Sequence, residues 1–104
     1  MIGDLDQRAT LQTRVLTPDG GGGYDESWEA FGTAWVKVAI LGASDTFGPD
    51  ALESRVRHRI VLRRRTDLAA GQRVLVGARI FKVHALLDEG PPAKTVTLLC
   101  EELP

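Results

Sequence analysis

The chain has 104 residues, which is the length of a single small domain. Its 43% apolar residues and formal net charge of −1 exclude a disordered polymer, and 13 Lys and Arg against 14 Asp and Glu argue against a dedicated nucleic-acid binder. No apolar run approaches the roughly 20 residues that cross a bilayer, and residues 1–10 lack the apolar core of a signal peptide.

Two extended segments are predicted in the first part of the chain. Residues 8–15 alternate between apolar and polar side chains, which predicts a half-buried strand. Thr17-Pro18-Asp19 and the glycines at 20–23 then predict a turn and a flexible hairpin loop. The glycine run lacks the Gly-Lys-Ser/Thr ending and the following helix of a phosphate-binding loop. A second extended stretch covers about residues 27–41, and Gly32 is expected to break it or to form a bulge.

The two tryptophans are expected to differ in burial. Trp35 lies inside the apolar run of the second stretch, so we expect it in the core. Trp28 is flanked by Ser27 and Glu29, so we expect it to be partly exposed or at an interface. If so, the two tryptophans contribute unequally to the free energy of unfolding.

Residues 42–54 interrupt the strand pattern. The segment contains two glycines, one proline and several polar residues, with Phe47, Ala51 and Leu52 as its apolar side chains. We expect a long loop, with a helical turn at residues 49–54, because proline suits the first turn of a helix. A loop of this length in a small domain is usually functional or disordered.

Residues 55–65 have the strongest alternation in the chain. Period two places Val56, His58, Ile60 and Leu62 on one face of a predicted strand. The other face carries arginines, namely Arg55, Arg57, Arg59, Arg63 and Arg65. Three roles are open for this arginine face: a solvated edge that resists aggregation, a subunit interface, or a surface facing nucleic-acid phosphates. As an interface, it would act in assembly and contribute little to the stability of the monomer.

The remaining strands complete an all-β fold. Residues 73–76 and 79–87 are predicted to form a hairpin that turns at Gly77-Ala78. Residues 94–101 close the chain as a strand with Val96, Leu98 and Cys100 on one face. We therefore predict one domain over residues 1–104, a small β-barrel or sandwich of five to six mostly antiparallel strands.

The sequence offers no catalytic, cofactor or metal site. None of the three serines lies in a nucleophile elbow, and the two histidines and one cysteine lack metal-ligand spacing. Cys100 is expected to be a small buried hydrophobe, and as a single cysteine it fits a reducing cytoplasm. His58 is expected to be a core or interface histidine. We therefore predict that the chain is not an enzyme and needs no cofactor.

The order of several short segments resembles the tailed-phage head–tail joining proteins, the stopper or head-completion family, with relatives in gene transfer agents. The resemblance covers nearly the whole chain. It rests on residues 2–8 before the first strand, 19–23, Trp28, 34–38, 58–63, 71–74, 77–83 and 98–102.

The resemblance implies a structural protein of a virion or virion-like particle, assembled in the bacterial cytoplasm. Its β-domain would form a sixfold or twelvefold ring at the particle neck, between the head adaptor and portal and the tail terminator or tail tube. Packaged DNA would pass without sequence-specific contact, no membrane would be involved, and a lumen-directed loop would help close the channel. In this chain the loop corresponds to Gly42, Ser44, Asp45, Thr46, Phe47, Gly48, Pro49 and Asp50.

A second hypothesis comes from a different class of protein. A small β-barrel can bind nucleic acid along a basic groove, and the arginine-rich strand could supply one. The near-zero net charge and the 6% aromatic content count against this alternative.

Overall fold

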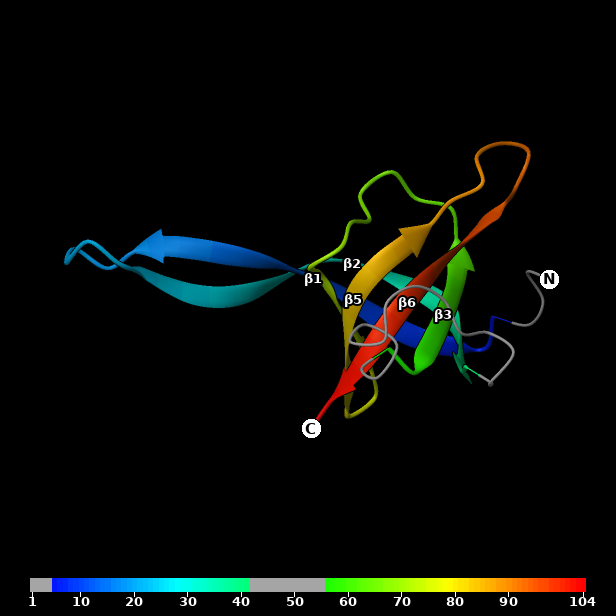
Figure 1. The fold of residues 1–104 in the computed structure, drawn as a ribbon, viewed down its shortest axis with the longest axis horizontal. Helices are drawn as coiled ribbons and strands as arrows, with labels where there is room; N and C mark the ends of the chain where they lie inside the picture. Colours follow the sequence, from blue (N-terminus) through cyan, green and yellow to red (C-terminus); the bar gives the residue numbers. More distant parts are fainter. Residues whose placement is uncertain (1–4, 42–55) are drawn as a thin grey trace.

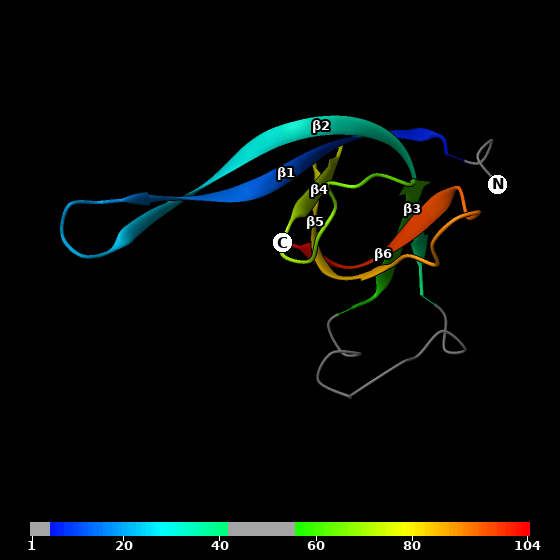
Figure 2. The same cartoon turned by 90° about the horizontal axis from the view of Figure 1, so that it is seen from above.

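The computed structural model describes residues 5–41 and 56–104, and in them the chain forms six β-strands and no helix. The strands are β1 (Gln7–Pro18), β2 (Tyr24–Ile40), β3 (His58–Arg63), β4 (Arg73–Val76), β5 (Arg79–Leu87) and β6 (Thr95–Leu103). All neighbouring pairs are antiparallel, and the order β1-β2-β3-β6-β5-β4 closes because β4 pairs with β1 (Figures 1 and 2). The all-β prediction is confirmed, and the fold is a barrel.

The barrel interior is filled by apolar side chains that all six strands contribute at every second position. Phe81 is the largest of them and is fully buried. The predicted inward faces of β3 and β6 are confirmed, since Ile60, Leu62, Val96, Leu98 and Cys100 are all buried. Burial raises the pKa of the Cys100 thiol to about 12, so this cysteine packs as a hydrophobe, as expected.

The predicted turn and bulge are both present. The β4–β5 hairpin turns at residues 77–78, where Gly77 has a φ of 60° that favours glycine. In the β1–β2 ladder Leu11 pairs with Gly32 but Gln12 pairs with Ala30. Phe31 is therefore an extra residue, and the expected irregularity at Gly32 is a β-bulge.

Beyond the bulge, β1 and β2 leave the barrel together as a two-stranded arm, residues 13–29. β4 pairs only with Ala9–Gln12 of β1, whereas Thr13–Pro18 pair only with Tyr24–Glu29 of β2. Figures 1 and 2 show the arm projecting from the barrel along the long axis of the molecule, which measures 48 Å. Its tip is held by Asp19, whose carboxylate accepts hydrogen bonds from the amides of Gly21 (2.8 Å) and Gly23 (3.1 Å).

The expectation that Trp35 is a core residue is wrong. Its side chain is 53% exposed, because strand periodicity turns its neighbours Ala34 and Val36 inward and Trp35 outward. The Arg8 guanidinium lies 5.5 Å from its ring centroid. Trp28 is half-buried, as expected, beneath the Arg73 guanidinium at 4.0 Å.

These positions predict opposite responses to truncation. We expect Phe81→Ala to cost about 3–5 kcal/mol of unfolding free energy, because it empties the centre of the barrel. We expect Trp35→Ala to cost about 1 kcal/mol or less, since it removes an exposed ring and one cation–π contact. Chemical denaturation of both variants measures the difference, and equal losses would contradict the outward placement of Trp35.

Candidate functional site

The predicted arginine face is present on the outside of the barrel. Arg57 and Arg63 are exposed and Arg59 is half-buried, while Ile60 and Leu62 between them point into the core. Arg55 and the predicted channel loop at 42–54 lie outside the described residues. The alternation predicted from the sequence is therefore confirmed for β3, and the role of the arginines in assembly stays a prediction.

Lys37 and Trp35 of β2 extend this surface. Lys37 is the Cα partner of Val61, so it shares the outward side of the sheet with the β3 arginines. We call the surface formed by Trp35, Lys37, Arg57, Arg59 and Arg63 the basic face. Part of it is a shallow hollow of about 330 Å³ that Lys37 and Arg59 line. Among residues 5–41 and 56–104, no carboxylate forms an ion pair with Lys37, Arg57 or Arg63.

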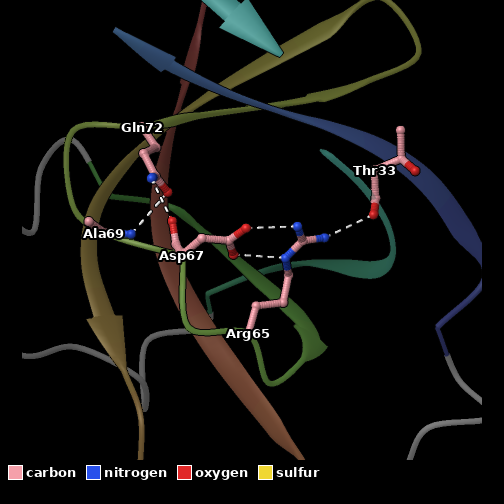
Figure 3. A network of polar contacts seen from close by, with 5 residues as sticks. All are labelled: Thr33, Arg65, Asp67, Ala69 and Gln72. Atoms are coloured by element: carbon pink, nitrogen blue, oxygen red, sulfur yellow. Dashed lines mark hydrogen bonds and ion pairs between the residues drawn. The ribbon is translucent and has the colours of Figure 1, made fainter. Parts of the chain in front are cut away.

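Arg65 lies apart from the basic face and binds within the chain (Figure 3). Its Nε and one terminal nitrogen donate to the two carboxylate oxygens of Asp67, both at 2.9 Å. Its other terminal nitrogen donates to the backbone carbonyl of Thr33 at 3.0 Å. The paired guanidinium holds the pKa of the Asp67 carboxyl below its ordinary value. This bidentate contact ties the segment after β3 to the middle of β2.

The surroundings of Arg65 explain two neighbouring residues. A Cβ at Gly32 would lie 2.6 Å from an Arg65 terminal nitrogen, so the glycine makes room for the guanidinium. Phe31, the bulged residue, packs its ring 5.9 Å from the same guanidinium. Gln72 then closes the following turn by donating to the Asp67 carbonyl and accepting from the Ala69 amide (Figure 3).

A second polar group covers the end of the barrel where β2 ends and β3 begins. Arg79 donates to both carboxylate oxygens of Glu102, at 2.9 and 3.0 Å, which lowers the pKa of that carboxyl. His58 packs edge-on against Phe81, with ring centroids 5.2 Å apart. Leu41 and Arg57 are joined here by a 2.8 Å backbone hydrogen bond, so the segment between them starts and finishes at adjacent points.

His58 is held in its neutral form. Burial lowers its pKa, and the nearby Arg79 charge lowers it further. Glu102 acts in the other direction, but its carboxylate is 3.7 Å away and already bound by Arg79, so burial prevails. The ring Nδ1 is buried with no hydrogen-bond partner among the described residues, which adds to the cost of a second ring proton. His58 is therefore partly buried against the core residue Phe81, which is compatible with the expected core or interface position.

The described residues offer charge and shape rather than reactive groups. Within residues 5–41 and 56–104, no three His, Cys, Asp or Glu side chains lie close enough together to hold a metal ion. Ser27 is on the arm, and Cys100 is buried. None of the described segments is a helix long and apolar enough to span a bilayer.

The comparisons with known proteins agree with one another. The family described as phage head completion protein matches residues 1–103. The solution structure of protein SF1141 from Shigella flexneri 2a is similar, with a TM-score of 0.76, 27% identity and coverage of 97% of this chain and 95% of that one. A chain in the virion of a native gene transfer agent particle is similar as well, with a TM-score of 0.67, 26% identity, and coverage of 95% and 96%. No curated protein matches.

Arg65, which binds within the chain, and Arg63 of the basic face are expected to respond differently to substitution. Arg65→Ser removes a bidentate ion pair and a bond to the Thr33 carbonyl, and with partial exposure we expect a loss of about 1–2 kcal/mol. Arg63→Ser is expected to change the unfolding free energy by about 0.5 kcal/mol or less. Urea denaturation separates the two, and a comparable loss in both variants would show that Arg63 also stabilises the monomer.

His58 is expected to make stability depend on pH. The pKa of His58 is lowered in the folded chain. Its contribution to the free energy of unfolding is therefore complete above the ordinary pKa of 6.5, and it is lost as the pH falls through the pKa of the folded state. His58→Gln should therefore flatten the decline in denaturation midpoint between about pH 7 and pH 5. His84→Gln is the control, because it removes a histidine and leaves His58. A decline as steep in His58→Gln as in the unaltered chain would exclude this role.

Proposed function

Because the chain belongs to the phage head completion protein family, we propose that it is a head–tail connector subunit whose copies form a ring joining a DNA-filled capsid to a tail. The match over residues 1–103 is the observation that carries the proposal. The family and the similarity to a gene transfer agent virion chain support a structural role in a phage-like particle. The ring would lie at the particle neck and be assembled in the bacterial cytoplasm.

The construction of the barrel suits a ring subunit. Its strands close on one another, so the barrel presents fixed surfaces rather than edges that add further strands. Identical copies joined through such surfaces form a closed ring when the rotation between neighbours closes. A sixfold or twelvefold ring would fit between the head adaptor and portal on one side and the tail terminator or tail tube on the other. Family membership supports these partners.

In this proposal the residues 42–54 help close the DNA channel. The described residues on either side of it, Leu41 and Arg57, hydrogen-bond to each other at one end of the barrel. Around a ring axis, identical copies of Phe47 would meet and supply apolar contact across the channel. The arginines at 55, 57, 59 and 63 would lie at subunit contacts or face the lumen, where DNA passes without sequence-specific contact, whereas Arg65 binds Asp67 and Thr33 of its own chain.

One observation favours a second function. The basic face carries an exposed tryptophan beside cationic side chains, a combination that binds single-stranded nucleic acid in other small barrels. The net charge of −1 counts against it, and so does the excess of carboxylates in the arm, residues 13–29, because both repel phosphates. Binding of free DNA at moderate salt, with a steep salt dependence, would favour the second function.

The connector proposal is tested by shortening the segment at 42–54. We expect deletion of residues 46–50 to leave a folded protein that still joins heads to tails, because the deletion spares every described strand. The particles should retain their packaged DNA poorly. Complementation of cells that lack the unaltered chain, followed by measurement of DNase-protected DNA per joined particle, gives the result.

Replacement of residues 46–50 by Gly and Ser at equal length is the matched control, because it keeps the chain length and removes the side chains. Poor retention in both variants would assign channel closure to the side chains, Phe47 among them. Joined particles that hold DNA as well as the unaltered ones would show that the segment only links β2 to β3 and does not close the channel.

A further inference from the structure

The arm exposes apolar side chains far from the barrel core. Partners in an antiparallel pair share one side of the ladder, so Leu16, Pro18 and Tyr24 lie on the same side of the arm. Leu16 is 46% exposed and Tyr24 is 65% exposed. An isolated two-stranded hairpin is marginally stable in water, and exposed apolar groups at its end are typical of a binding surface.

The charges of the arm and of the basic face are complementary. Residues 13–29 contain Arg14 and four carboxylates, Asp19, Asp25, Glu26 and Glu29, which gives a net charge of −3. Arg14 pairs with Glu26 at 3.3 Å, and among the described residues no cation pairs with Asp25 or Glu29. The basic face carries one lysine and three arginines.

The two surfaces lie on opposite sides of the barrel. Along β2 the arm comprises Tyr24–Glu29, whereas the stretch that pairs with β3 is Val36–Ile40. Figures 1 and 2 show the arm on one side of the barrel and β3 on the other. The arm therefore faces away from the basic face of its own chain, and a second copy can present that face to it.

We propose that the arm of one copy binds the basic face of the next copy. Asp25 and Glu29, which lie on the side of the arm opposite Leu16 and Tyr24, would face the lysine and arginines. Because the contact joins two different patches, it is head-to-tail and repeats around a ring when the rotation closes. The inference rests on the ring of the proposed function and supplies the contact that holds its copies together.

The test exchanges the charges of the two surfaces. The arm variant carries Asp25→Lys and Glu29→Lys, and the face variant carries Lys37→Glu and Arg63→Glu. We expect sedimentation equilibrium to show self-association of the unaltered chain, weakened about tenfold or more in either variant alone. An equimolar mixture should recover association, because each variant then offers the other an arm and a face of opposite charge.

Two single substitutions control for the sign of the charge change, each with half the change of the double variants. Glu89→Lys and Lys82→Glu alter exposed charges outside both surfaces and should leave association unchanged. An unaltered chain that stays monomeric, or a mixture that associates no better than its components, would overturn the proposal. So would a face variant that loses affinity for duplex DNA in fluorescence anisotropy while its self-association is unchanged, since the face would then bind nucleic acid.

Particle complementation separates this inference from the connector role. Joined particles formed by the arm variant alone would overturn the arm contact and leave the connector role standing. Failure of either variant alone, with recovery when both are expressed together, supports the contact in the particle itself. Failure of the unaltered chain to restore joining would overturn the connector role instead.

Discussion

The pairing of β4 with four residues of β1 closes the barrel, and the rest of the structure depends on it. Ala9–Gln12 are hydrogen-bonded on both sides, to β2 and to β4, so their inward side chains reach a core that every strand surrounds. Beyond Gln12, which pairs with the first residue of β4, β1 has only β2 as a partner. The bulge between Leu11 and Gln12 lies at this point, and bulges bend a strand, so the two strands leave the barrel as the arm.

Closure also determines where polar groups can lie. A barrel has two open ends, and in the described part of the chain a bidentate arginine ion pair lies near each of them. Arg79 with Glu102 covers one end beside His58, and Arg65 with Asp67 ties β2 to the segment after β3 at the other. The arginines between them on β3 point outward, where copies of the chain or other proteins can reach them.

Strand periodicity predicted much of this from the sequence, and it also corrects the expectation for Trp35. The inward residues of β3 and β6 and the hairpin at Gly77 follow from alternation and turn chemistry. The apolar neighbours of Trp35 favour a core position, but strand alternation places Val36 inward and therefore Trp35 outward. Whether a residue occupies an inward or an outward position of the strand decides its burial, and the hydrophobicity of its neighbours does not.

The arm and the Arg65 network could not be predicted from local patterns. Residues 13–18 alternate in the same way as residues 9–11, and only the short length of β4, far along the chain, makes them leave the barrel. Arg65 continues the alternation of the other arginines, but it lies beyond the end of β3. Its acceptor on Thr33 is 32 residues away in sequence, so only the folded chain brings them together.

Electron microscopy of particles produced with and without this chain tests most directly whether it joins heads to tails. We expect joined particles with the chain, and DNA-filled heads beside unattached tails without it. Joined, DNA-filled particles formed in the absence of the chain would contradict the connector role.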